Sequence, residues 1–249
     1  MIEKTLIVVG PGGVGKSPLD ALFKTDIKID PYRLRSSGPR DSNDIFYAHP
    51  KLRDELHSVL KDLGDEQETK DGVEWFPKSK VLFFKVRKEW QFLIFKGLKG
   101  KFAKAEIYAP VLPAILSISD IKSLLGEVRI VVLNPVSQSV KVMQDWVELK
   151  KKTEYNCKQR GDDPKTVKKR VESVDEEAPA WKELIKNHGA VEYCNWQFPE
   201  YLYKEHDLVE HQKQVLLQAR QYLLKANLDL EVFFKSVNEI GQIREPFVK

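Results

Sequence analysis

A glycine-rich segment near the start of the chain constrains the fold more than any other feature. Residues 10–17 read GPGGVGKS, match the pattern G-x-x-x-x-G-K-[ST] in full, and directly follow the apolar, β-branched run 5–9 (TLIVV). A short continuous run of this kind predicts a strand buried on both faces of a parallel sheet. A buried strand that leads into a phosphate-binding glycine loop predicts a P-loop core.

The residue types of this loop explain the chemistry that the pattern predicts. Glycines allow backbone N–H groups to point at phosphate oxygens, the Lys16 ammonium can reach the β and γ phosphates, and the Ser17 hydroxyl can ligate Mg²⁺. Pro18 fits the first turn of a following helix, where its missing N–H would be unpaired in any case. We therefore expect ATP and Mg²⁺ as cofactors and a nucleotide site made of Gly10, Gly12, Gly13, Val14, Gly15, Lys16 and Ser17.

Two further apolar runs extend the predicted core. Residues 114–118 (AILSI) and 128–133 (VRIVVL) predict strands. Between them, residues 120–125 (DIKSLL) predict a short helix that Asp120 caps and Gly126 ends. Strand, helix and strand in this order form a βαβ unit. The expected fold class is therefore α/β, with a P-loop core whose parallel sheet is flanked by helices.

The rest of the chain divides by composition into an insertion and a C-terminal region. In the insertion we expect an exposed loop at 31–44, a helix at 51–60, a polar loop at 62–72 and a hairpin of strands 80–87 and 91–96. In the C-terminal region we expect helices at 139–156, from 167 until Pro179, and at 207–226, with a charged mobile segment at 158–169. The expected domains are a core of residues 1–29 and 109–249, with a lid at about 140–178, and an insertion at 30–108.

Other classes of P-loop protein fit the remaining sequence less well. GTPases usually carry an Asn-Lys-x-Asp motif and an Asp-x-x-Gly motif, neither of which stands in a suitable place here, and Asn134-Pro135 is no substitute. Large ATPases need further modules, for which 249 residues leave little room. A small phosphotransferase is left.

The order of motifs along the chain resembles that of the guanylate kinases and their nucleoside monophosphate kinase relatives. The matching pieces are GPGGVGKS at 10–17, YRLRSSGPRDSND at 32–44, AILSISD at 114–120, VRIVVLNP at 128–135 and RGDDPKTVKKRVESVDEE at 160–177. These pieces are scattered motifs that cover roughly half the chain. The resemblance implies an ATP-dependent transfer of a phosphoryl group to a nucleotide or another small phosphorylatable substrate. It also implies that the insertion binds the acceptor.

The resemblance further implies roles for particular arginines. Arg160 and Arg170 of the lid would act with Lys16 as catalytic residues, because phosphoryl transfer spreads negative charge over oxygens that fixed cations stabilise. Arg35 and Arg40 would hold the acceptor's phosphate, since a guanidinium fork suits bidentate contact.

Three other polar residues belong to the same implied site. Tyr47 would add a hydroxyl to the acceptor site, and Arg33 is a further candidate there. Asp120 would orient Mg²⁺ together with Ser17, or would serve only as a helix cap, and both interpretations stay open.

The chain also departs from the family in two places. The Tyr-Gly-Thr segment expected after the hairpin is missing, and its neighbourhood reads GLKGKFAKAEIYAP at 97–110. The first lid arginine is absent, although the lysines at 150–152 could compensate for it. The identity of the acceptor therefore stays open.

Three alternatives remain at this point. Asp30, before Pro31 at the end of an expected second strand, could act as general base on an alcohol acceptor, or it could be a turn residue. A nucleotide-binding scaffold without transfer is the second alternative. The third is a kinase of nucleic-acid ends. With 41 Lys and Arg against 37 Asp and Glu, the net charge of +4 is too small to indicate nucleic-acid binding.

Composition indicates a globular protein of the cytoplasm. Only two cysteines occur, without a C-x-x-C pair, so neither a disulfide framework nor a structural zinc site is expected. The apolar run at 5–9 is too short for a signal peptide, and nowhere do ~18 apolar residues run together as a membrane span requires. We therefore expect no membrane partner.

Overall fold

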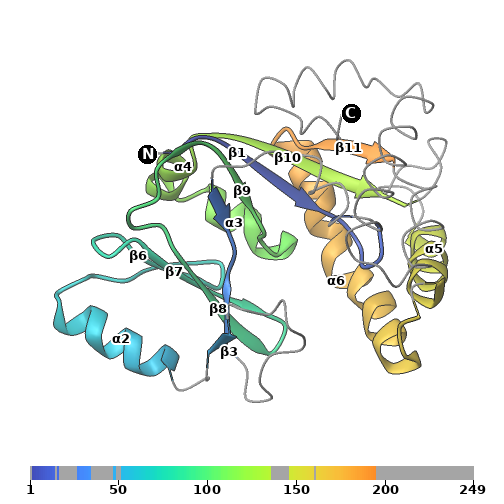
Figure 1. Cartoon of the computed structure of the whole chain (residues 1–249), viewed down its shortest axis with the longest axis horizontal. Helices are drawn as coiled ribbons and strands as arrows, with labels where there is room; N and C mark the ends of the chain where they lie inside the picture. Colours follow the sequence, from blue (N-terminus) through green and yellow to red (C-terminus); the bar gives the residue numbers. More distant parts are fainter. Residues whose placement is uncertain are drawn as a thin grey trace, which may run out of the picture. The chain divides into compact units, whose positions relative to one another are not determined.

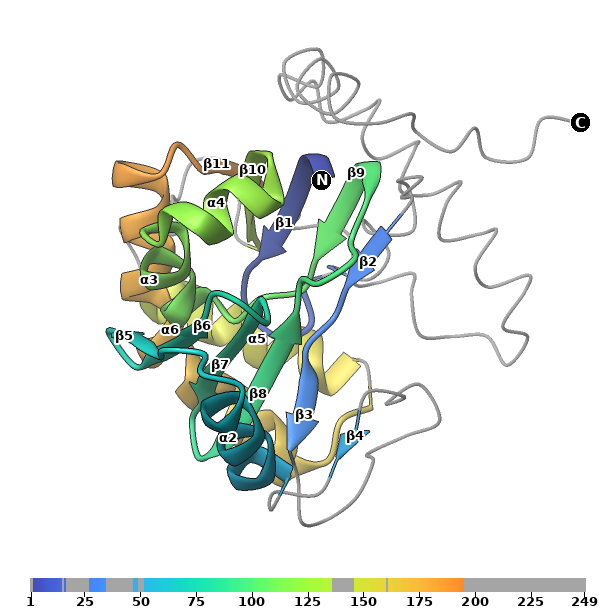
Figure 2. The same cartoon turned by 90° about the vertical axis from the view of Figure 1, so that its left-hand side faces the viewer.

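The computed structural model describes residues 2–14, 16, 27–34, 47–48, 52–135, 146–159 and 161–194. Its fold is mixed α/β, with a parallel sheet flanked by helices and a second, largely antiparallel sheet (Figures 1 and 2). The chain divides into two compact units: unit 1 holds residues 1–5 and 27–128, and unit 2 holds residues 6–26 and 129–249. The boundary passes through the strands β1 and β10. The helix expected at 207–226 lies outside the described residues.

The first sheet has the strand order β11-β10-β1-β9-β2. Its strands are β1 (Ile2–Val9), β2 (Ile27–Ile29), β9 (Gly100–Ala105), β10 (Glu127–Asn134) and β11 (Val191–Cys194). The strand β10 pairs in parallel with β11, and β2 pairs in parallel with β9. The strands predicted from residues 5–9 and 128–133 are thus confirmed, and residues 5–9 and 130–133 are buried as that prediction required.

Unit 2 contains two packed helices beside its strands, α5 (Trp146–Gln159) and α6 (Pro164–Asn187). The start of helix α6 is stabilised by its N-cap Asp163, whose side chain accepts hydrogen bonds from the backbone N–H groups of Lys165 and Thr166. Pro164 occupies the first turn, where a proline is favoured. The expected end at Pro179 is wrong, since the helix continues to Asn187.

Tertiary packing explains why helix α6 does not stop at Pro179. The proline is exposed, while Ala178, Trp181 and Leu184 are buried on either side of it. Burial of this face stabilises the helix across the missing backbone hydrogen bond.

Unit 1 contains a six-stranded sheet in the order β4-β3-β8-β7-β6-β5. Its strands are β3 (Tyr32–Leu34), β4 (Tyr47–Ala48), β5 (Glu68–Lys70), β6 (Val73–Phe76), β7 (Val81–Val86) and β8 (Glu89–Ile94). The predicted hairpin is confirmed as β7 and β8, which pair antiparallel from Val81↔Ile94 to Val86↔Glu89. The loop expected at 62–72 is wrong in part, because β5 falls inside it.

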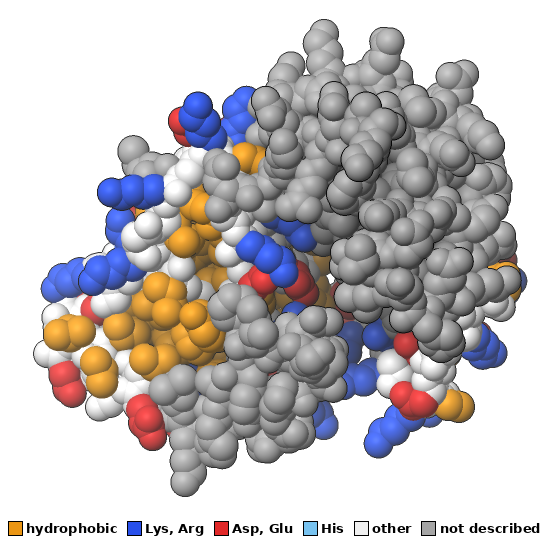
Figure 3. Space-filling model, viewed as in Figure 1, with side chains coloured by type: hydrophobic (Ala, Val, Ile, Leu, Met, Phe, Trp, Pro, Cys, Tyr) orange, Lys and Arg blue, Asp and Glu red, His pale blue; other side chains and the backbone are white. Residues whose placement is uncertain are grey.

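Helix α2 (Leu52–Asp62) packs on this sheet and confirms the helix predicted at 51–60 (Figure 2). Leu60 of the helix joins a core cluster with Phe76, Phe83 and Phe92 of the sheet. Hydrophobic side chains also gather on the surface of unit 1 in Figure 3, and the side chains of Val59 and Leu63 beside this core are 53% and 68% exposed.

The strand expected at 114–118 is wrong. Residues 109–125 instead form the short 3-10 helix η1 (Ala109–Val111) and the helices α3 (Leu112–Leu116) and α4 (Ser119–Leu125). Pro113 fits the first turn of α3, and a short apolar run cannot by periodicity alone be told from a buried helix. The βαβ unit expected around residues 114–133 is therefore absent from these described residues.

The structure also corrects the helix cap. Ile118 is the N-cap of α4 without a side-chain hydrogen bond, so Asp120 lies in the first turn and does not cap the helix. Among the described residues, no helix is both long enough and apolar enough to cross a membrane.

Candidate functional site

The glycine loop leaves β1 at Val9 and stays close to β10 within unit 2. Gly10 has a φ of 145°, and a Cβ on it would lie 2.8 Å from the carbonyl oxygen of Leu133. Only glycine fits such a backbone angle and such a close approach. The first glycine of the motif thus has a structural reason that is independent of any ligand.

Lys16 folds its side chain back over the start of this loop. Its Nζ donates hydrogen bonds to the carbonyl oxygens of Gly10, at 2.6 Å, and Pro11, at 2.8 Å. The ammonium is partly buried, so the loop curls around a positive charge. A phosphate group offers a lysine stronger, charge-assisted hydrogen bonds than a neutral carbonyl does. This arrangement fits a loop that binds the phosphates of a nucleotide.

Arg170 of α6 lies across the same loop. A Cβ built on Gly12 would lie 3.0 Å from Cδ and 3.3 Å from Cγ of Arg170, so the aliphatic part of the arginine covers this glycine. Its Nη1 lies 3.4 Å from Oδ2 of Asp162, which precedes α6. The arginine side chain is 33% exposed, which leaves the guanidinium accessible to a bound anion.

Asp162 is a residue that the sequence analysis missed. The signal was present, because an Arg-Gly segment is followed by two aspartates just before a helix that carries Arg170. Asp163 caps that helix, whereas Asp162 pairs with the arginine. Hydrogen bonds from the Thr166 hydroxyl and the backbone N–H groups of Thr166 and Lys165 lower the pKa of Asp163, against a smaller opposing effect of burial.

A face of α5 also contacts the loop, and the sequence analysis did not identify it. The Sγ of Cys157 lies 3.8 Å from the carbonyl oxygen of Gly12. A Cβ on Gly13 would lie 3.3 Å from Cβ of Asn156. This face of the helix is fully buried and is formed by Thr153 and, one turn later, by Asn156 and Cys157.

The structure brings together some of the predicted site residues and leaves others undescribed. In unit 2, Arg170 lies against Gly12, and Lys16 donates a hydrogen bond to the carbonyl oxygen of Gly10. The other predicted loop residues described in this unit are Gly13 and Val14. The predicted residues Gly15, Ser17, Arg35, Arg40 and Arg160 lie outside the described residues.

Two predicted residues belong to unit 1. Asp120 is exposed in the first turn of α4. Tyr47 lies in β4, opposite Arg33 of β3. Their proposed roles stay predictions, and Arg33 itself donates a hydrogen bond to Glu106 at 3.0 Å.

Asp30 follows β2 in unit 1 and is the candidate base for an alcohol acceptor. Its side chain is only 10% exposed, and its Oδ2 lies 2.6 Å from Nζ of Lys28. Its other oxygen, Oδ1, is buried and has no hydrogen-bond partner among the described residues. An unpartnered buried carboxylate oxygen is able to accept a proton from a hydroxyl group.

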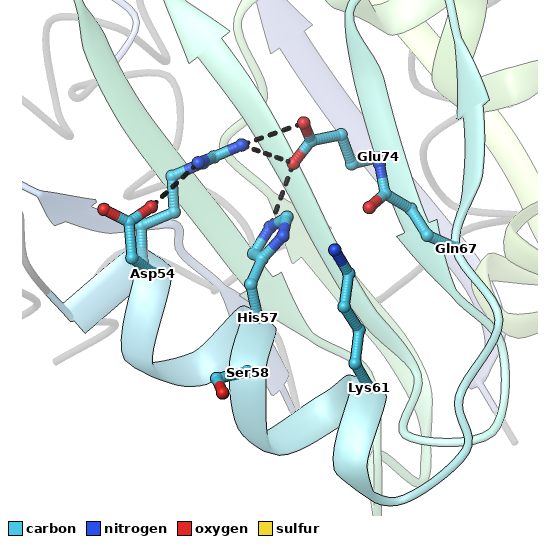
Figure 4. A pocket seen from close by; sticks show the side chains of 7 residues that line it. Asp54, His57, Ser58, Lys61, Gln67 and Glu74 are labelled. Atoms are coloured by element: carbon cyan, nitrogen blue, oxygen red, sulfur yellow. Dashed lines mark hydrogen bonds and ion pairs between the residues drawn. The ribbon is translucent and has the colours of Figure 1, made fainter.

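Unit 1 also holds a shallow pocket of about 480 Å³ between α2 and the sheet (Figure 4). It is lined by Arg53, Asp54, His57, Ser58, Lys61, Gln67 and Glu74. Arg53 donates to both carboxylate oxygens of Glu74, at 2.9 and 3.1 Å, and its guanidinium lies 4.0 Å from the centre of the Trp90 ring. Nε2 of His57 lies 3.0 Å from the same carboxylate.

The surroundings of His57 in this pocket disfavour its protonated form. Burial is the largest influence and lowers the pKa of His57 below its ordinary value of 6.5. The charge of Glu74 opposes this shift, while the charges of Arg53 and Lys61 add to it. The imidazole ring also packs in T-shaped contacts against the rings of Phe76 and Phe83, at 5.0 and 4.6 Å between centroids.

Comparison with solved structures finds a distant likeness of fold. No protein-family model matches the chain, and neither does any curated protein. Among solved structures, the guanylate kinase from Anaplasma phagocytophilum is similar to 88% of this chain and 85% of its own, with 13% sequence identity and a TM-score of 0.38. This is a distant similarity of fold, and it assigns no activity to the chain.

Proposed function

We propose that the protein is an ATP- and Mg²⁺-dependent phosphotransferase of the nucleoside monophosphate kinase type, which transfers the γ-phosphoryl group of ATP to a nucleotide-like acceptor. The observation that carries the proposal is that Lys16 and Arg170 contact one and the same glycine loop. Phosphoryl transfer needs positioned cations more than it needs covalent chemistry, because the transition state spreads charge over the phosphoryl oxygens.

Lys16 has the first role in the proposed mechanism. Its ammonium exchanges the carbonyl oxygens of Gly10 and Pro11 for the β and γ phosphate oxygens, which bind it more strongly. The backbone N–H groups of the loop hold the remaining phosphate oxygens. Together these groups fix the position of the donor.

Arg170 has the second role. It leaves its contact with Asp162 and stabilises the negative charge on the transferred phosphoryl group, with Arg160 as the second cation of the lid. Closure of the lid excludes water that would otherwise hydrolyse ATP.

Ser17 and Asp120 are the residues proposed to hold Mg²⁺, which would neutralise charge between the β and γ phosphates. The acceptor phosphate is assigned to Arg35, Arg40 and Tyr47. The missing Tyr-Gly-Thr segment leaves the base of the acceptor unassigned.

The test is a transfer assay with Mg²⁺, ATP and a panel of nucleoside monophosphates, with nucleosides as alcohol acceptors. We expect Lys16→Ala to lower transfer by orders of magnitude, and Arg170→Ala to lower it about 100-fold or more, because each removes charge stabilisation of the transition state. Lys169→Ala is the matched control, since Lys169 is an exposed cation next to Arg170 on the same helix.

Two results would contradict the proposal. Full transfer by the Lys16 variant would exclude the loop as the active site. ATP binding by the unmodified protein without transfer to any acceptor would favour a nucleotide-binding scaffold.

A second candidate function is transfer to an alcohol, with Asp30 as general base. The buried, unpartnered Oδ1 of Asp30 favours it. In that case a nucleoside or another alcohol, rather than a monophosphate, becomes phosphorylated, and Asp30→Asn abolishes transfer while ATP binding persists.

A further inference from the structure

Helix α5 buries three polar atoms that have no hydrogen-bond partner among the described residues. They are Oγ1 of Thr153 and both Oδ1 and Nδ2 of Asn156, and both residues are 0% exposed. Buried polar groups in folded proteins nearly always have a partner, so three orphaned atoms within one helical turn need an explanation. Leaving them unpaired disfavours the conformation in which they are seen.

These atoms lie beside the glycine loop. The Cβ of Asn156 is 3.3 Å from the position of a Cβ on Gly13, and the neighbouring Cys157 thiol lies 3.8 Å from the Gly12 carbonyl oxygen. The partners that are missing from α5 are therefore of the kind that a peptide group of this loop supplies, a backbone N–H and a backbone carbonyl.

A ligand in solvent cannot reach Asn156 directly, because its two amide atoms are each almost fully shielded from solvent. Any influence on nucleotide binding must pass through the loop. In the present conformation, Lys16 holds the carbonyl oxygens of Gly10 and Pro11. A phosphate that draws this lysine away releases those carbonyls and allows the glycine peptides to turn.

We infer that Asn156, with Thr153, is a positioning residue whose unmet hydrogen bonds are satisfied by the glycine loop only in its phosphate-bound conformation. This inference rests on the proposed nucleotide binding. The orphaned groups raise the free energy of the ligand-free protein and not that of the bound protein. They thereby shift the population of the loop toward the bound conformation.

Replacing a fully buried polar residue of this helix should raise, and not lower, the melting temperature of the ligand-free protein. Asn156→Leu keeps roughly the volume of the side chain and removes the unpaired polar atoms, so the ligand-free protein should melt at a higher temperature. The same variant should bind Mg-ADP about tenfold more weakly and gain less thermal stability from it, because the loop then finds no partner on α5. Thermal melts with and without Mg-ADP, together with calorimetric titration, measure all three quantities on the full chain.

Asn134 provides the matched control, because it is equally buried but its Nδ2 donates to Oε1 of Glu192 at 2.7 Å. Asn134→Leu removes a satisfied hydrogen bond and should lower the melting temperature of the ligand-free protein. Thr153→Val, which exchanges a hydroxyl for a methyl group, should behave like Asn156→Leu and replaces it if that variant does not fold.

The outcomes separate this inference from the proposed function. A lower melting temperature for the Asn156 and Thr153 variants without ligand, or unchanged affinity for Mg-ADP, overturns the inference and leaves the proposed function standing. Failure of the unmodified protein to bind Mg-ADP or Mg-ATP overturns both.

Discussion

Gly12 is where the glycine loop and helix α6 touch. A Cβ at this position would lie 3.0 Å from Cδ of Arg170, closer than real Cβ atoms normally come to a neighbour. Because the neighbour is part of a long, flexible side chain, a substitution displaces the arginine and not the helix. A substitution at Gly12 should therefore displace the Arg170 guanidinium and still leave the arginine in the protein.

Gly12→Ala should lower phosphoryl transfer at least tenfold while leaving the melting temperature nearly unchanged, because the added methyl group moves Arg170 off the loop. A transfer assay and a thermal melt test this expectation. The double variant with Arg170→Ala is the control, since the glycine substitution should have little further effect once the arginine is gone. Equal effects of Gly12→Ala in both backgrounds would show that the contact is irrelevant to transfer.

At the same scale, the sequence indicated the loop residues and Arg170 but not their partners. A glycine motif can be recognised in a sequence because one loop conformation requires its residue types at fixed spacing. The burial of Asn156 against Gly13 depends on how α5 folds back on the loop. Such packing leaves no local pattern in the sequence.

Helix α6 is the element whose length the sequence underestimated. Pro179 lies in its interior, where a proline lacks a backbone N–H and collides with the carbonyl of the preceding turn. The buried residues on both sides of Pro179 hold the helix together. Because Pro179 itself is exposed, replacing it removes few packing contacts.

Pro179→Ala should stabilise the protein by about 1–3 kcal/mol, because alanine restores the backbone hydrogen bond and has a far higher helix propensity. Urea unfolding of both proteins measures this difference. Pro164→Ala is the control, since Pro164 occupies the first turn, where its ring is tolerated, and should give no comparable gain. A loss of stability on replacing Pro179 would mean that the helix requires a kink there.

The other elements show where sequence patterns suffice. Continuous apolar runs predicted β1 and β10 correctly because such runs are typical of strands that are buried on both faces of a sheet. The similar run at 114–118 forms the end of helix α3 and the turn after it, and β5 has an entirely exposed, polar sequence that pairing with β6 makes a strand. In both cases the neighbours decided, and not the local propensity.

At the scale of the whole molecule, three groups in the described part of the chain have shifted pKa values that make stability depend on pH. The pKa of His57 is lowered, chiefly by burial, so its contribution to stability is complete above pH 6.5 and is lost as the pH falls through its folded pKa. Burial alone would raise the pKa of Asp65, but hydrogen bonds from Ser79 and Lys78 outweigh it and lower that pKa below 3.8. The pKa of Asp163 is also below 3.8, and both contributions are lost only in stronger acid.

The urea midpoint should therefore fall as the pH is lowered from 7 to 5, and fall again below about pH 4. His57→Phe, which keeps an aromatic ring beside Phe76 and Phe83, should remove the first decline and keep the second. Ser58→Ala, one position along the same pocket, is the control and should keep both declines. A decline between pH 7 and 5 that persists in the His57 variant would assign it to another group.

The contacts of the glycine loop also bear on how the protein is made. The loop is synthesised well before Leu133 of β10 and Arg170 of α6, which lie against Gly10 and Gly12. At ribosomal rates, the nascent chain carries the loop without Arg170 for on the order of 10 s. A nucleotide bound at the proposed site would therefore stabilise this region only late in translation, and until then the apolar strand β1 would be exposed to aggregation and to binding by chaperones.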